Sequence, residues 1–136
     1  MTCRILIVED EPILRKTLGE RFTQEGFAAL LAKDGEEGLN LALTKKPELI
    51  LLDIILPKMD GMTLFAKMRE TNDWGKQVPV ILLTNLTADD QIMRGVEENK
   101  PAYYLVKTDF TLDEVVAKVR ERLARPTAAA EPENRI

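Results

Sequence analysis

The chain has 136 residues, of which 45% are hydrophobic and 31% charged, a balance that suits one folded domain with one core. A net charge of −4 without a basic cluster argues against a nucleic-acid-binding surface. No apolar run approaches the roughly 18 residues of a membrane span, and residues 5–8 are too short a run for a signal peptide. Cys3 is the single cysteine, so we expect a reducing, cytoplasmic location.

Histidine is absent from the chain. This excludes His-assisted serine or cysteine catalysis and every metal site that relies on imidazole. A metal bound here would be a hard cation held by oxygen atoms.

Apolar runs alternate with helix-period segments along the chain. The runs are typical of parallel strands, and the four consecutive apolar residues 49–52 are expected to be covered on both faces of the sheet. Five such runs are expected as strands, at residues 4–8, 27–32, 49–52, 80–83 and 103–106.

Each strand is followed by a segment with the spacing of an amphipathic helix. The first buries Leu14, Leu18 and Phe22, the next two open at Asp34 and Asp60, a fourth is expected over 87–98, and the last opens with the capping box Thr111 and Glu114. Alternating strands and helices predict an α/β fold with a parallel sheet and right-handed crossovers. Residues 1–124 form this domain, and 125–136 lack a period and are expected to be a tail or linker.

Polar residues follow four of these strands directly. Glu9 and Asp10 follow the first, Asp53 the third, Thr84 the fourth and Lys107 the fifth. Because parallel strands end at the same edge of a sheet, where α/β proteins bind ligands, these side chains are expected to meet there. A single Asp in such a place is more often a loop or cap residue, but the repetition favours a site.

These five residues, together with the segment 53–61, resemble the receiver domain of two-component response regulators over residues 4–124. The resemblance implies a flavodoxin-like, doubly wound five-stranded sheet with strand order 2-1-3-4-5 and five helices. It also implies a phosphorylatable switch in a phosphorelay, served by a histidine kinase or phosphotransfer protein and acting on a downstream protein.

The resemblance assigns a role to each site residue. Asp53 would accept the phosphoryl group. The carboxylates of Glu9, Asp10 and Asp53, with the backbone carbonyl of Ile55, would hold Mg²⁺, a cation that prefers oxygen ligands.

Thr84 and Lys107 would bind phosphoryl oxygens, and Tyr104 would be the aromatic residue that moves with Thr84. Tyr103 is a competing candidate by residue type, although strand alternation puts it on the opposite face. The apolar residues Ile55 and Leu86, each two positions past a site residue, predict slow loss of the phosphoryl group.

The sequence departs from the family pattern at two places. Thr108 follows Lys107 where the family usually has a proline after a cis bond, and a cis bond to threonine would cost about 3–4 kcal/mol, so we expect it to be trans. Pro101 stands just before the fifth strand, which is tolerable if that strand lies at the edge of the sheet.

Other function classes fit less well. An aspartate-nucleophile phosphohydrolase would need a second Asp at position 55, which is isoleucine. A nucleotide- or flavin-binding module would need a glycine-rich loop after the first strand, where the chain has Glu9 and Asp10. A phosphorylation-independent pseudo-receiver is the closer alternative, but such a domain is expected to lack a site residue.

A phosphorylation-dependent homodimer is one interpretation of the charged helix faces in the last third of the chain, although solvated faces are the commoner meaning. The acidic set is Asp89, Asp90, Glu97 and Glu98, and the basic set is Lys118, Arg120 and Arg122.

Overall fold

The computed structural model describes residues 3–84, 101, 103–107 and 110–124 of the chain. Its centre is a five-stranded sheet in the order β2-β1-β3-β4-β5, with every neighbouring pair parallel. The strands are β1 (Arg4–Val8), β2 (Ala28–Ala32), β3 (Leu49–Leu52), β4 (Val80–Thr84) and β5 (Tyr103–Val106). The fold class and strand order expected from the sequence are therefore confirmed.

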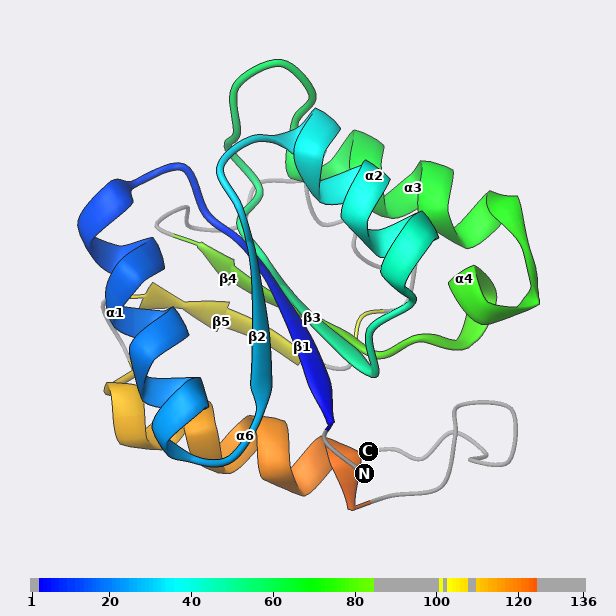
Figure 1. Cartoon of the computed structure of the whole chain (residues 1–136). Coiled ribbons are helices and arrows are strands. Elements are labelled where there is room, and N and C mark those ends of the chain that lie inside the picture. Colours follow the sequence, from blue (N-terminus) through cyan, green and yellow to red (C-terminus); the bar gives the residue numbers. More distant parts are fainter. Residues whose placement is uncertain (1–2, 85–100, 102, 108–109, 125–136) are drawn as a thin grey trace.

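Helices cover both faces of the sheet (Figure 1). α1 (Pro12–Gln24) and α6 (Leu112–Leu123) lie on one face, and α2 (Gly35–Lys45) and α3 (Gly61–Thr71) lie on the other, with the short α4 (Asp73–Gln77) beside α3. Within the described residues, no helix is long and apolar enough to cross a membrane.

The alternation of side chains along the strands divides the core into two layers. In β1, Leu6 and Val8 pack toward α2 and α3, whereas Ile5 and Ile7 pack toward α1 and α6. β3 lies in the middle of the sheet, and its four residues are all buried. A strand covered on both faces has to be apolar throughout, which is why residues 49–52 carry no polar side chain.

The helix starts expected from the sequence are confirmed. Asp34 and Asp60 are the N-caps of α2 and α3, and each side chain accepts a hydrogen bond from a backbone N–H three residues on. Thr111 and Glu114 form the capping box of α6. The α4 helix was not predicted, because five residues are too few to show a helical period; Asn72 caps it. The helix expected over 87–98 and the segment 125–136 lie outside the described residues.

Ion pairs link the C-terminal part of α1 to α6 at the protein surface. The carboxylate of Glu25 lies 2.9 Å from Arg21 Nε and 2.7 Å from Arg120 Nη2. Arg21 also reaches Asp113 on α6, at 2.6 Å. Arg122 does not belong to an exposed basic face, contrary to the expectation, since it is only 8% exposed. Only Lys118 and Arg120 of the expected basic set are accessible on α6.

Stability should depend on Glu25 in a pH-dependent way. Its pKa is lowered by hydrogen bonds from Arg120 and then Arg21, so the ionised carboxylate stabilises the fold above its unfolded-state pKa and this stabilisation is lost as the pH falls through the lowered value. We expect Glu25→Gln to reduce the free energy of unfolding at pH 7 and the difference from wild type to shrink in acid, measured by urea denaturation. Asp113→Asn removes one contact instead of two and should have the smaller effect.

Candidate functional site

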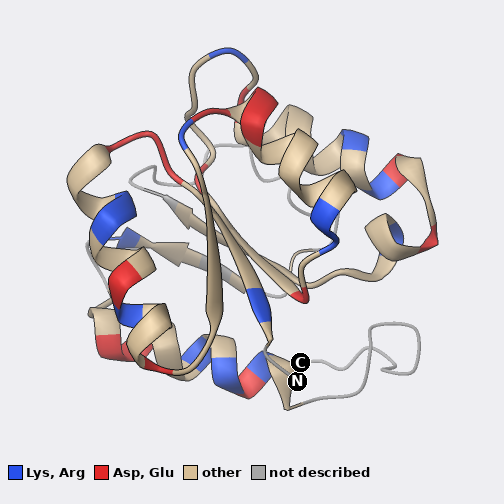
Figure 2. Ribbon diagram, in the orientation of Figure 1, with Lys and Arg blue, Asp and Glu red and all other residues tan. Residues whose placement is uncertain are grey.

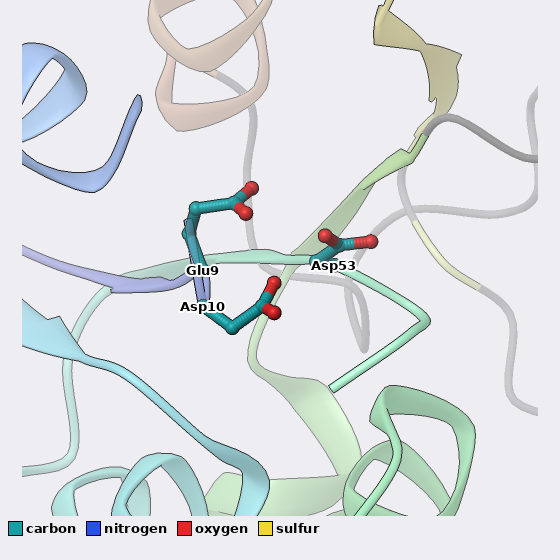
Figure 3. Close-up of side chains that lie close together, drawn as sticks. All are labelled: Glu9, Asp10 and Asp53. Atoms are coloured by element: carbon teal, nitrogen blue, oxygen red, sulfur yellow. The ribbon is translucent and has the colours of Figure 1, made fainter. Parts of the chain in front are cut away.

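The expected acidic residues meet at the carboxyl edge of the sheet. Glu9 and Asp10 follow β1, Asp53 follows β3, and the two strands are neighbours. One carboxylate oxygen from each residue lies within 4.8 Å of the others, and the side chains converge on a common space (Figure 3). Figure 2 shows the acidic segment between β1 and α1 above the ends of the strands. A group of three carboxylates at this spacing is a candidate site for a divalent cation.

Lys107 neutralises part of this negative charge. Its Nζ lies 2.6 Å from Glu9 Oε1 and 3.1 Å from Asp53 Oδ2. The three side chains are nearly withdrawn from solvent, with exposed fractions of 13% for Lys107, 3% for Glu9 and 9% for Asp53. One ammonium therefore bridges two buried carboxylates that come from different strands.

The buried setting shifts the pKa values of Glu9 and Lys107. Burial raises the pKa of Glu9, and the hydrogen bonds from Lys107 and the Glu11 backbone only partly offset it. For Lys107, burial alone would lower the pKa, but Glu9 and Asp53 together outweigh it, so its pKa is raised. The ammonium thus stays charged, while Glu9 becomes easier to protonate than an exposed glutamate.

Backbone hydrogen bonds fix where the carboxylates emerge. The N–H of Asp53 donates to Val8 O at 3.1 Å, and the N–H of Glu9 donates to Ala32 O at 3.0 Å. Arg15 on α1 holds the turn between these elements, since its Nη1 donates to Glu9 O at 3.0 Å and to Asp10 O at 3.3 Å. No sequence pattern marks Arg15 as part of the site, because its contacts are with carbonyl groups that any residue would supply.

The loop after Asp53 is held at two places where a side chain would not fit. A Cβ at Gly61 would lie 2.0 Å from Asp53 O, and one at Gly35 would lie 1.7 Å from Met59 O. The N–H of Gly61 donates to Ile54 O at 2.7 Å, and the N–H of Gly35 donates to Pro57 O at 3.3 Å. The loop is therefore anchored to the start of α3 and to the start of α2, and Asp53 lies at its base.

Asp34 and Lys58 add to this anchoring. Lys58 has a positive φ of 69°, and its Nζ lies 3.8 Å from the buried Asp34 carboxylate. In the sequence, Asp34 and Gly35 indicate only the start of a helix. Their contact with residues 57–59 joins segments about 20 residues apart, and no local pattern reports such a contact.

The structure brings together Glu9, Asp10, Asp53 and Lys107 as expected. Ile55 lies beside them with its side chain 59% exposed, and its N–H faces Asp53 Oδ1 at 3.4 Å.

Thr84 is the last residue of β4 and is paired with Val106 of β5. Tyr104 lies in β5, paired with Leu82. Their side chains lie outside the described part of the structure, as do Leu86 and Thr108, which includes the Lys107–Thr108 bond.

Comparison with known proteins agrees with this arrangement. The family model of the response regulator receiver domain matches residues 5–120. The chain belongs to the response regulator receiver domain family. It is thus a receiver domain of the kind found in two-component systems.

Named relatives include two curated proteins. The response regulator MprA of Mycolicibacterium vanbaalenii is 30% identical over 127 residues, covering 93% of this chain and 53% of the relative. The probable transcriptional regulator ycf27 of Guillardia theta is 36% identical over 127 residues, covering 93% of this chain and 48% of the relative. The chain therefore spans about half the length of these curated relatives.

Solved receiver domains have the same fold. The Francisella response regulator 1452 receiver domain superposes with a TM-score of 0.80 at 27% identity, covering 91% of this chain and 98% of that one. The BeF3-activated N-terminal receiver domain of Klebsiella pneumoniae RstA gives 0.78 at 29% identity, with 90% and 99% covered.

Removing the Lys107 ammonium should destabilise the protein strongly. Lys107→Met leaves two buried carboxylates without their cation, and we expect a loss of about 3 kcal/mol at pH 8 by urea denaturation. The loss should shrink as the pH falls, because burial already raises the pKa of Glu9 and a proton can replace the missing cation. The control is Lys58→Met: the Lys58 side chain is 59% exposed, and its replacement should cost less than about 1 kcal/mol. Equal losses in the two variants would contradict this account of the site.

Proposed function

We propose that the protein accepts a phosphoryl group on Asp53 from a phosphohistidine of a histidine kinase or phosphotransfer protein. The observation that carries this is the position of Asp53, 7% exposed at the end of β3 and within contact of Lys107. A carboxylate oxygen of Asp53 would attack phosphorus while the phosphorus–nitrogen bond breaks and the imidazole keeps the electron pair. The product is an acyl phosphate on Asp53 and a histidine free to take up a proton.

Mg²⁺ is the cation that fits the acidic cluster. The ligand set is oxygen only, and carboxylates gathered within 4.8 Å of one another repel unless a cation lies among them. Glu9, Asp10 and Asp53 would hold the ion, with the backbone carbonyl of Ile55 as a neutral ligand. The bound ion would supply charge neutralisation for the incoming phosphoryl group, and the protein holds the carboxylates in place through the backbone bonds of β1 and β3.

Phosphorylation would change the partners of Lys107. The ammonium now lies between Glu9 and Asp53, at 2.6 and 3.1 Å. A phosphoryl group on Asp53 adds a charge of about −1.5 to −2, enough to draw Lys107 and the Thr84 hydroxyl toward it. Movement of Thr84 would pass to Tyr104 in the neighbouring strand β5 and so alter a protein-binding surface.

Residues 1–124 would form the receiver, with 125–136 as a tail or linker. The output would be a downstream protein bound through the altered surface. A phosphorylation-independent pseudo-receiver is the second candidate, but no observation favours it, because Glu9, Asp10, Asp53 and Lys107 are all present and assembled.

Phosphorylation of Asp53 can be tested with a small phosphodonor. We expect Asp53→Asn to abolish labelling by acetyl phosphate in the presence of Mg²⁺, because the amide is not a nucleophile for this reaction. Thr84→Ala should keep the labelling and weaken the conformational response, followed by NMR chemical shifts with beryllofluoride. The control is Asp60→Asn, an exposed N-cap outside the cluster. Undiminished labelling of Asp53→Asn would place the phosphoryl group elsewhere.

The metal requirement can be tested by comparing two acids of the cluster. Asp10 is exposed and makes no side-chain hydrogen bond or ion pair within the described residues, whereas Glu9 is committed to Lys107 and the Glu11 N–H. We therefore expect Asp10→Asn to lower Mg²⁺ affinity and labelling more than Glu9→Gln does. Labelling that proceeds equally in a chelator would refute the metal-dependent reaction.

The lifetime of the acyl phosphate should be long. Hydrolysis needs a water positioned in line with the bond to phosphorus, and the Ile55 side chain at the edge of the site cannot hydrogen-bond such a water. Replacing Ile55 by Asn together with Leu86 by Glu should accelerate the loss of labelled phosphate in a filter assay. A wild-type half-life of seconds, or a double variant that decays no faster, would show that these two side chains do not control the access of water.

A further inference from the structure

The outer edge of β2 has no charged residue, unlike much of the protein surface. β2 forms one edge of the sheet, and its residues Ala28–Ala32 include no charged residue and no proline. In Figure 1, β2 lies in front of the sheet between α1 and α2, and no described element covers its outer side. Leu31 is 40% exposed there. Soluble proteins normally protect such an edge with charges, prolines or bulges, because an open apolar edge pairs with other strands.

The hydrogen bonds of β2 define which backbone groups point outward. The N–H of Ala28 donates to Cys3 O, at 2.9 Å, and Ala32 O accepts from the N–H of Glu9, at 3.0 Å. Both bonds go to the side of β1. Since successive residues of a strand point their backbone groups to opposite sides, the N–H and C=O groups of Ala28, Leu30 and Ala32 face β1, and those of Ala29 and Leu31 face outward.

The open N–H groups of this edge are limited to these two residues. Before it, the N–H of Phe27 donates to Phe22 O at 3.0 Å. After it, the N–H of Lys33 donates to the Glu37 side chain at 2.8 Å. Within the described part of the chain, no hydrogen bond is made to the outward groups of Ala29 and Leu31. Ala29 and Leu31 therefore offer two N–H donors and two C=O acceptors at this edge.

We propose that β2 pairs antiparallel with β2 of a second copy of this chain, about a two-fold axis at Leu30. Only this register uses all the outward groups of Ala29 and Leu31: Ala29 exchanges two hydrogen bonds with the partner's Leu31, and Leu31 exchanges two with the partner's Ala29. Moving the two-fold axis by one residue, to Ala29 or to Leu31, leaves half of these groups unpaired. The two sheets become one continuous sheet of ten strands.

Side chains beside the edge also fit a second copy. A groove of about 750 Å³ runs between α1 and β2, lined by Gly19, Ala29 and Leu31 among others. At Gly19 the helix α1 packs closely against Leu31, since a Cβ there would lie only 3.1 Å from Leu31 Cδ2. In the proposed register the partner's Leu31 side chain lies beside Ala29, on the same face of the sheet as this groove, and covers apolar surface that is now exposed.

The charges next to the groove favour a copy of the same chain. Arg15, Lys16 and Glu20 line it from α1, and Lys16 and Glu20 are one helical turn apart. Across a two-fold axis perpendicular to the sheet, the two α1 helices lie on the same face and run antiparallel. Each helix then presents both signs of charge to the other, and the uncharged strand presents no like charges to itself.

The experiment is sedimentation velocity of the full chain, unphosphorylated, from micromolar to millimolar concentrations. We expect a reversible monomer–dimer equilibrium, and we expect Leu31→Lys to weaken it by about tenfold or more, because an isologous pair places the new charge in the apolar groove of both copies. Ile13→Lys is the matched control. It also replaces an exposed aliphatic residue, 75% exposed, but on α1 and outside the groove lining, and it should dimerise as wild type does. Circular dichroism melting checks that both variants fold.

Amide hydrogen exchange by NMR provides the second readout. On dimerisation the N–H groups of Ala29 and Leu31 should become protected as concentration rises, whereas the N–H of Leu30, which faces β1, should not change. A monomer at every concentration would overturn the proposal. A dimer that Leu31→Lys leaves intact, or one without new protection at Ala29 and Leu31, would place the interface elsewhere and overturn it too.

Discussion

The structure depends on how the repulsion between two buried carboxylates is balanced at the carboxyl edge of the parallel sheet. The sheet delivers Glu9 and Asp53 to the same edge and buries both, and the ammonium of Lys107 lies between them at 2.6 and 3.1 Å. Burying two carboxylates together is unfavourable without a cation. The lysine at the end of β5 thus joins the two acid-bearing strands to the far edge of the sheet by electrostatics as well as by the strand ladder. A metal ion or a phosphoryl group at this edge would act on the same balance of charge.

A second constraint fixes the position of the loop after Asp53 at this edge of the sheet. The loop after Asp53 touches the starts of α2 and α3 so closely that Gly35 and Gly61 cannot carry a Cβ. Each glycine also donates its N–H to a carbonyl of that loop. The backbone around Asp53 is therefore defined by contacts from both helices of one core layer. The short, fully buried strand β3 adds to this rigidity, because it leaves Asp53 no freedom to slip along the sheet.

The two edges of the sheet end differently. Lys107 directly follows β5 and contributes its ammonium to the site. β2 contains only alanine and leucine, and two of its residues have backbone groups open to pairing. The pairing proposed for β2 lies away from the carboxylate cluster. It therefore differs from the dimer that the sequence suggested, which would form through the last two helices of the chain. Arg122 is one of the basic residues expected at that interface, and it is buried.

The sequence by itself determined the order of strands and helices along the chain, the helix caps at Asp34, Asp60 and Thr111, and the acids and lysine that gather at one edge. These follow from local rules: apolar runs, caps, and the fact that parallel strands end together. The short helix α4, the anchoring by Gly35 and Arg15, and the burial of Arg122 were decided only by the tertiary structure. The same holds for the pairing of Lys107 with Glu9 as well as Asp53. Each of these depends on a contact between segments distant in sequence, or on an element too short to show a period, and neither leaves a pattern in the order of the residues.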